Sequence, residues 1–423
     1  MPLNRRDMLA GLGAIGLASG LPLYAFPQTN ARIVVIGGGF GGTSAARTLK
    51  HLLPNASIAL IEPKATYVTC PFSNVEIGKL GSLTPISFSY TALEAEGIKV
   101  HQAEATSVDP IRQTVQITGG ETLAYDRLIL SPGIDFRANA IEGYDLQDAP
   151  NRMPHAWKAG DQTRLLMRQL REMEDGGLFV MSVPPAPYRC PPGPYERASL
   201  IAHYFKTQKP RSKVLILDGK DQFSKMPLFQ EAWKEHYPDH LEWRSATDDG
   251  RVSKVDIQNL TLSTDFEDIQ ADVANVIPPQ KAGTIAERAG VTDSTGWCPI
   301  DALSFASTLQ PNIHVIGDAT IAAPMPKSAF SANLQGKICA HAIARILAGK
   351  EPIATTLANT CYSFTTPDEA VSIVGVYSNS DSKLSSIPGA GGLSPLAADK
   401  SIRYAEARQA KIWYDAITTE AFG

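Results

Sequence analysis

A glycine-rich loop between a buried strand and a helix constrains the fold of this chain more than any other feature. Residues 32–36 read Arg-Ile-Val-Val-Ile, a run typical of a buried parallel strand. The run leads into Gly-Gly-Gly-Phe-Gly-Gly at 37–42 and then into a helical stretch at 43–53. This order of strand, glycine loop and helix predicts a βαβ unit that binds a dinucleotide.

Three glycines of the loop and one acidic residue after it have predicted roles in that unit. Gly37 permits the tight turn, Gly39 lets the backbone approach a pyrophosphate, and Gly42 lets helix and strand pack closely. A second strand at 57–61 leads to Glu62, about 20 residues after the last glycine, where a carboxylate binds the adenosine ribose. The N-terminus of the helix favours the negative charge of the phosphates.

Two later segments indicate which dinucleotide is bound. The stretch 125–133 resembles the strand and turn with which two-dinucleotide flavoproteins leave their FAD domain, and 312–319 is a buried strand that ends in Gly-Asp-Ala. In that superfamily the aspartate binds the ribitol chain of FAD, so the resemblance assigns this role to Asp318; the alternative is a helix N-cap. A helix is expected over 328–344, with its N-terminus toward the flavin. FAD is therefore the predicted cofactor.

The middle of the chain keeps the strands of a second such unit but not its glycine loop. Strands are predicted at 177–182 and 213–218, and a proline-rich stretch at 183–197 contains Cys190. Prolines lack the backbone N–H groups that would hold a pyrophosphate. An electron donor other than NAD(P)H is therefore expected. The stretch is interpreted as a catalytic loop around Cys190 or, alternatively, as a loop that is merely stiff.

Three of the five cysteines carry a specific family resemblance. The segment Thr69-Cys70-Pro71, the loop 188–197 around Cys190, and Cys361 look like the flavoprotein subunit of flavocytochrome c sulfide dehydrogenase. The resemblance implies that Cys70 carries FAD through a thioether to the flavin 8α carbon. It also implies that Cys190 and Cys361 form a redox-active disulfide beside the flavin. The remaining cysteines match no such role: Cys298 and Cys339.

The resemblance also implies an architecture. The expected fold is α/β, with two doubly wound, Rossmann-like domains of the glutathione-reductase type and a C-terminal interface domain. The FAD-binding domain would be discontinuous, at 29–145 and 283–350. A degenerate NAD-binding-like domain at 146–282 would carry the redox cysteine loop, and 351–423 would form the C-terminal domain. A chain of 423 residues is long enough for two or three such packed units.

The chemistry of these residues suits sulfide as the substrate. Hydrosulfide is a soft nucleophile, and its attack on a disulfide would leave a persulfide and a thiolate. Glu196 is interpreted as an acid or base for the sulfur steps, as proposed for the matching glutamate of the family, or as half of a structural ion pair. Arg189 and Arg197 would attract hydrosulfide or steady a thiolate, or would form surface salt bridges.

The predicted electron acceptor is a separate c-type cytochrome subunit in a heterodimer, because none of the five cysteines begins a C-x-x-C-H haem motif. Three alternatives stay open. The chain could be a periplasmic thiol or persulfide oxidoreductase that supports a sulfur-oxidation carrier system, a sulfide:quinone oxidoreductase, or a flavin-bearing binding protein without activity. The helical stretch 399–418 carries charges without a broad apolar face, which argues against a quinone at a membrane surface.

The N-terminus and the overall charge indicate where the chain works. Residues 4–9 form a twin-arginine pattern, and an uncharged run follows to about residue 24. This predicts a Tat signal over 1–28 rather than a transmembrane anchor, and a periplasmic mature chain without an integral membrane segment. A net charge of -4 without a Lys/Arg cluster excludes nucleic acid as a partner. No metal site is predicted, because the histidines and cysteines lack ligand spacing.

Overall fold

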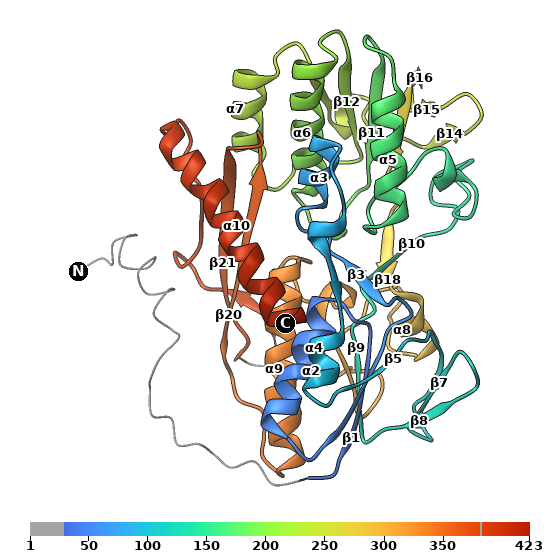
Figure 1. Cartoon of the computed structure of the whole chain (residues 1–423), viewed down its shortest axis with the longest axis vertical. Helices are drawn as coiled ribbons and strands as arrows, with labels where there is room; N and C mark the ends of the chain where they lie inside the picture. The colour runs from blue at the N-terminus through green and yellow to red at the C-terminus, as the bar shows by residue number, and fades with distance from the viewer. Residues whose placement is uncertain (1–28, 381–382) are drawn as a thin grey trace.

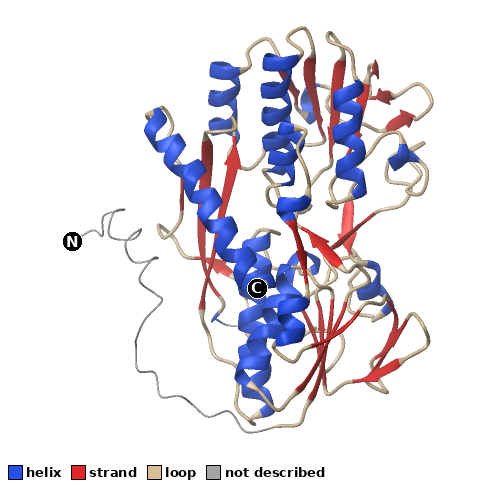
Figure 2. Cartoon of the chain, in the orientation of Figure 1, coloured by secondary structure: helices blue, strands red, loops and turns tan. Residues whose placement is uncertain are grey.

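The computed structural model describes residues 29–380 and 383–423, and its elements fall into three parts (Figures 1 and 2). In Figure 1 the lower part combines blue segments from early in the chain with orange segments from much later. The upper part, in green and yellow, comes from the middle of the chain, and the red C-terminal part runs along one side of both. The predicted signal segment 1–28 lies outside the described residues.

The lower part is built around a five-stranded parallel sheet with the order β19-β9-β1-β2-β5. This is the strand order of a doubly wound dinucleotide-binding domain. The late strand β19 pairs with β9, so the sheet joins segments that are far apart in the sequence. The bounds are β1 Arg32–Ile36, β2 Ser57–Ile61, β5 Lys99–His101, β9 Arg127–Leu130 and β19 Ile313–Val315.

Two helices, α2 (Phe40–Leu52) and α9 (Ala329–Leu347), pack together beside this sheet. A Cβ atom on Gly336 would lie 2.5 Å from the carbonyl oxygen of Gly41, so the two helices touch through their backbones. The opposite face is covered by an antiparallel sheet instead of helices, with buried residues of both sheets in one core. Its strands are β6 Ala105–Asp109, β7 Thr114–Ile117 and β8 Thr122–Ala124.

The upper part repeats this plan with a four-stranded parallel sheet, in the order β13-β12-β11-β17. Helices cover one face, and a second antiparallel sheet contributes buried residues to the core on the other face. The parallel strands are β11 Leu178–Val183, β12 Lys213–Asp218, β13 Leu241–Arg244 and β17 Val273–Val276. The helices are α5 Asp161–Glu172, α6 Gly193–Gln208 and α7 Met226–His236. The antiparallel strands are β14 Lys254–Asp256, β15 Thr261–Ser263 and β16 Asp268–Gln270.

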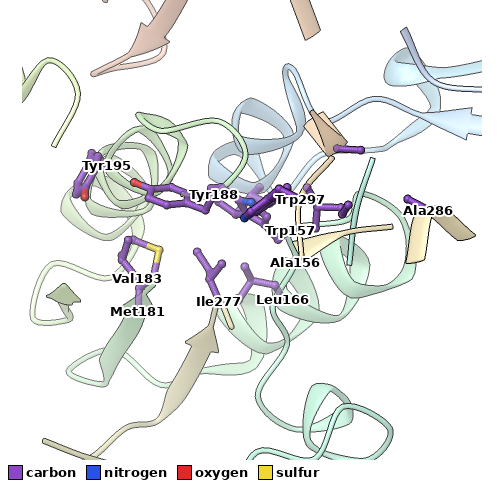
Figure 3. Packing of buried hydrophobic residues seen from close by; sticks show 14 of the residues in the cluster. Ala156, Trp157, Leu166, Met181, Val183, Tyr188, Tyr195, Ile277, Ala286 and Trp297 are labelled. Carbon is purple, nitrogen blue, oxygen red and sulfur yellow. The ribbon is translucent and has the colours of Figure 1, made fainter. Parts of the chain in front are cut away.

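The proline-rich loop is held by this core. Figure 3 shows Tyr188 of the loop extending toward Tyr195 of α6, with Val183 and Met181 of β11 beneath them in this view. Both tyrosines are buried, and the Tyr188 hydroxyl donates to the Pro191 carbonyl at 2.8 Å. The loop is therefore fixed in place at the end of β11, where a glycine loop would stand in a nucleotide-binding unit.

The C-terminal part consists of an antiparallel hairpin and a long helix. Strand β20 (Thr356–Phe364) pairs with β21 (Ala370–Ser378), and α10 (Lys400–Phe422) packs on both strands and on α2. The ring of Phe422 stacks on Tyr67 at a centroid distance of 5.3 Å, which ties α10 to the FAD-binding part. None of the helices in the described part of the chain combines the length and the apolar character needed to cross a bilayer.

Short elements connect these parts. The loop after β2 contains β3 (Thr66–Val68), α3 (Ser73–Lys79), β4 (Ser87–Ser89) and α4 (Thr91–Ala95). Between the two large sheets lie β10 (Ile134–Phe136) and β18 (Gln280–Ala282), followed by α8 (Thr284–Arg288). Two short strands pair with β21: β22 Ser385–Ser386 and β23 Gly392–Leu393.

Candidate active site

One cavity of about 580 Å³ joins all three parts of the molecule. The glycine loop and the three cysteines singled out in the sequence all line this cavity. Most of the predicted site residues line this cavity, although in the sequence they are spread from Gly37 to Cys361. The lining includes Gly37, Gly39, Glu62, Cys70, Arg189, Cys190, Glu196, Asp318 and Cys361.

The glycine loop has the geometry of a pyrophosphate cradle. Gly37 has a φ of +104°, and a Cβ atom there would overlap the carbonyl oxygen of Ser131. Gly42 lies behind the loop, where a Cβ atom would overlap the carbonyl oxygen of Gly37. Both positions exclude a side chain for steric reasons, as the sequence predicts. The loop opens into the N-terminus of α2, which favours a bound phosphate.

The acidic residue at the end of β2 lies beside this cradle. The Glu62 carboxylate accepts hydrogen bonds from two backbone N–H groups, that of Gly38 at 2.9 Å and that of Lys64 at 3.2 Å. It also lines the cavity. A carboxylate fixed at this edge can accept hydroxyl groups of a ribose, so its placement fits the adenosine half of FAD.

The side chain of Asp318 is placed to bind the other half of FAD, its flavin half. Its Oδ1 atom is buried and has no hydrogen-bond partner, while its Oδ2 lies 3.8 Å from Nη1 of Arg189. Burial raises the pKa of this carboxyl. The N-cap of α9 is Ser328, whose hydroxyl accepts from Ser331 N at 3.1 Å, so Asp318 does not cap that helix. An unpaired buried oxygen in a cavity suits a ribityl hydroxyl group.

Cys70 lies in the loop between β3 and α3, on the cavity wall. Its Sγ lies 3.6 Å from the carbonyl oxygen of Trp157. The preceding Thr69 is buried, and its hydroxyl is 2.8 Å from the hydroxyl of Tyr414 on α10. This sulfur therefore comes from the FAD-binding part and faces the same space as the glycine loop.

Cys190 and Cys361 reach the cavity from the two other parts. Cys190 lies in the proline-rich loop with a φ of +56°, and its N–H donates to the carbonyl of Lys327 at 2.8 Å. Cys361 lies in the middle of β20, paired with Ile373 of β21. The structure holds both as thiols, and burial raises the pKa of each. A thiolate at Cys361 would raise the pKa of Cys190 further, because like charges repel.

Glu196 lies in the first turn of α6 and connects two neighbouring elements. Its Oε2 accepts from the side-chain amide of Asn74 at 2.8 Å, and its Oε1 accepts from the backbone N–H of Phe364 at 2.9 Å. Both partners are neutral, so Glu196 is held by hydrogen bonds and not by an ion pair. Burial raises the pKa of Glu196, and the two hydrogen bonds partly oppose that effect. Its carboxyl therefore keeps its proton to a higher pH than an exposed glutamate does.

The two arginines that flank the proline-rich loop are not at the surface. Arg197 is 1% exposed and donates to Asn74, Asn275 and backbone carbonyls, with its guanidinium 5.1 Å from the ring centroid of Trp157. Burial lowers its pKa to about 10. Arg189 lines the cavity and donates to the Trp157 carbonyl. The alternative of surface salt bridges is therefore wrong for both.

Two polar residues near the cysteines were missed by the sequence analysis. Asn74 connects Glu196 with Arg197 through its side-chain amide. Lys225 is 3% exposed and donates to the backbone carbonyl of Cys361 at 3.1 Å. Neither lies in a recognisable motif, and only their position in the fold reveals them. Among the described residues, no group of three or more His, Cys, Asp or Glu side chains could hold a metal ion.

The fold and the site define an FAD-dependent oxidoreductase with two dinucleotide-binding-type domains. A model described as pyridine nucleotide-disulphide oxidoreductase matches residues 31–169. The sulfide dehydrogenase [flavocytochrome c] flavoprotein chain central model matches 163–278, and the flavocytochrome c sulphide dehydrogenase flavin-binding model matches 353–422. The chain belongs to the family of flavoprotein chains of flavocytochrome c sulfide dehydrogenase, as the sequence resemblance predicted.

Individual relatives agree with this assignment. The chain is 60% identical over 43 residues to the sulfide dehydrogenase [flavocytochrome c] flavoprotein chain of Chlorobaculum thiosulfatiphilum, which is 10% of this chain and 90% of that sequence. It is 21% identical over 335 residues to the mitochondrial sulfide:quinone oxidoreductase of Mus musculus, over 77% of this chain and 73% of that protein. The crystal structure of sulfide:quinone oxidoreductase from Aquifex aeolicus shares the fold, with a TM-score of 0.73, 16% identity and 92% of each chain covered.

These findings confirm the predicted fold class and family, and FAD as the cofactor. The chain is an FAD-dependent sulfide oxidoreductase. The relatives are named for different electron acceptors, so they do not identify the acceptor of this chain.

Proposed function

We propose that the chain oxidises sulfide at a disulfide between Cys190 and Cys361, and that its electrons pass through FAD to a c-type cytochrome subunit in the periplasm. The observation that carries the proposal is the meeting of these two cysteines with Cys70 in the cavity that also contains the dinucleotide cradle. A pair of cysteines beside a flavin provides the electrophilic sulfur that hydrosulfide attacks.

The side chains around the two cysteines support the first step. The raised pKa makes the ionised Glu196 carboxylate a stronger base than an exposed glutamate, which suits it to accept the proton of hydrogen sulfide. The Arg189 cation in the cavity wall attracts the resulting hydrosulfide. Attack forms one S–S bond, breaks the Cys190–Cys361 bond, and leaves a persulfide and a thiolate. FAD, when bound, supplies a carrier that takes two electrons and returns them one at a time.

The covalent link to FAD is a separate part of the proposal. If Cys70 carries FAD through a thioether, the flavin of the holoprotein should stay with acid-precipitated polypeptide, and Cys70→Ala should release nearly all of it to the supernatant. The measurement is flavin absorbance in both fractions. Cys298→Ala is the matched control, because Cys298 is buried outside the cavity. Release of FAD from the unmodified protein would show that the link is absent.

The choice of cytochrome over quinone rests on features of the chain. It lacks a haem motif of its own, and its twin-arginine segment predicts export to a compartment with c-type cytochromes. The apolar residues exposed on α10 are few and are interspersed with charges: Ile402, Tyr404 and Ile412. A quinone acceptor is the second candidate, favoured by the similarity to sulfide:quinone oxidoreductases over most of the chain.

A purification with two acceptor assays tests this choice. The protein is isolated from the periplasmic fraction of its source cells, and the sample is examined for a haem-stained chain. We expect such a chain to co-purify and sulfide-dependent reduction of its haem to exceed reduction of a soluble quinone by at least about tenfold. Efficient quinone reduction without a haem chain would support the second candidate instead.

A further inference from the structure

Lys225 is a buried lysine that the proposed sulfide chemistry leaves without a role. It immediately precedes α7 in a left-handed backbone conformation, with a φ of 64°, and is 3% exposed. Its Nζ donates to the Cys361 carbonyl at 3.1 Å, to the Ser363 hydroxyl at 2.7 Å and to the Val371 carbonyl at 3.4 Å. All three acceptors are uncharged. A buried ammonium is costly without a nearby anion, so an anion in its surroundings would be strongly favoured.

The geometry of β20 indicates where that anion forms. Cys361 and Ser363 are two positions apart on one strand, so their side chains lie on the same face. Because the Ser363 hydroxyl accepts from Lys225, its own proton is free to point toward the Cys361 sulfur. Hydrogen bonding from Ser363 and the positive charge of Lys225 both lower the pKa of Cys361, against the larger effect of burial.

The other titratable groups around Cys361 act in the opposite direction. Glu196 on α6 raises the pKa of Cys361 when it is ionised, and Cys361 and Cys190 disfavour each other as thiolates. Among these charged neighbours, Lys225 is the one that favours a negative charge on Cys361. Uptake of a proton by Glu196 would remove its repulsion and leave the Lys225 charge in effect.

We propose that Lys225 and Ser363 form a positioning pair that stabilises Cys361 as a thiolate. The proposal rests on the proposed function and assigns a direction to its first step. Hydrosulfide forms a bond to Cys190 Sγ, the Cys190–Cys361 bond breaks, and its electron pair stays on Cys361. The products are a persulfide on Cys190 and a thiolate on Cys361. The disulfide itself is the oxidant, so this step consumes no other reactant.

Alkylation of Cys361 as a function of pH tests the pair directly. The background is the FAD-containing Cys190→Ser protein, in which iodoacetamide labelling of Cys361 is followed by mass spectrometry from about pH 6 to pH 10. Adding Lys225→Gln should raise the midpoint by about one pH unit, which slows alkylation about tenfold below it. Ser363→Ala should raise the midpoint by a smaller amount, and Lys225→Arg should keep most of the effect of lysine.

Matched variants separate this role from a structural one. Lys220→Gln removes another largely buried lysine near the end of β12, one that pairs with Asp218 instead of Cys361, and should leave the midpoint unchanged. In a Glu196→Gln background, Lys225→Gln should still raise the midpoint. If Lys225 acted only by neutralising the charge of Glu196, the midpoint would not change in this background. If the Lys225→Gln protein does not bind FAD, the pair is tested with the other two variants. Ser363→Ala should then raise the midpoint, and Lys225→Arg should leave it close to that of lysine.

An unchanged midpoint in a folded, FAD-containing Lys225→Gln or Ser363→Ala protein would overturn the pair. Alkylation does not require sulfide, so this result is independent of turnover. If Cys190→Ser protein still oxidises sulfide, the proposed function is wrong even where the midpoint shifts as expected.

Discussion

Replacement of Cys190 by serine is expected to stop sulfide from reducing the bound flavin. Serine keeps the size of the side chain but cannot form a disulfide with Cys361, so hydrosulfide loses its electrophile. The rate of flavin bleaching under anaerobic sulfide should fall by roughly a thousandfold or more, a loss typical of a missing nucleophile or covalent partner. Stopped-flow absorbance of the flavin measures this rate.

The variant should keep its cofactor, because Cys190 lies in the proline-rich loop, whereas the glycine loop that would hold the pyrophosphate comes from a different part of the chain. The visible spectrum of the oxidised flavin is therefore the test of an intact site. Cys339→Ala, at a fully buried cysteine of α9, provides the control and should bleach at the normal rate. Sulfide reduction at an unaltered rate in the Cys190→Ser protein would contradict the disulfide mechanism.

Replacement of Glu196 by glutamine should change the pH dependence of turnover. Burial raises the pKa of Glu196, so the ionised form that accepts a proton is lost at a higher pH than for an exposed glutamate. With saturating sulfide, the rate of the unmodified protein should fall as the pH drops through this raised pKa. Glutamine cannot ionise, so this limb should disappear and the maximal rate should fall about a hundredfold.

Glutamine can still accept the hydrogen bond from Phe364, which keeps the local structure near its original form. The matched control is Glu76→Gln, since Glu76 is a buried glutamate of α3 outside the cavity. It should retain the acid limb. A Glu196→Gln protein with the same limb and a similar maximal rate would show that Glu196 has only a structural role.

The cofactor end of the site could be predicted because its signals are local. The glycines and Glu62 lie within one βαβ unit, and their spacing is fixed by the turn and the helix that they form. The helix predicted at 328–344 begins at Ala329, close to the expected start, and extends to Leu347. The C-terminal helix was predicted to end at 418, and it continues to Phe422 because aromatic contacts hold its last turn.

The sulfur end of the site depends on contacts between distant segments. No local pattern connects Cys190 with Cys361, and their shared cavity followed only from the family resemblance. Lys225 has no motif of any kind, since its importance arises from a hairpin more than a hundred residues later in the chain. Similarly, the antiparallel sheets on the second face of each parallel sheet replace the helices expected of a doubly wound unit, because short strands bury the same apolar surface.

The position of β20 has a consequence for the order in which the molecule is made. Cys361 and Phe364 form part of the cavity wall, and α10 then packs over the hairpin that carries them. A ribosome that has completed both parallel sheets has therefore still not built a closed flavin pocket. We therefore expect FAD to be retained stably only after the C-terminal part has emerged and folded, which would make cofactor loading a late step in maturation.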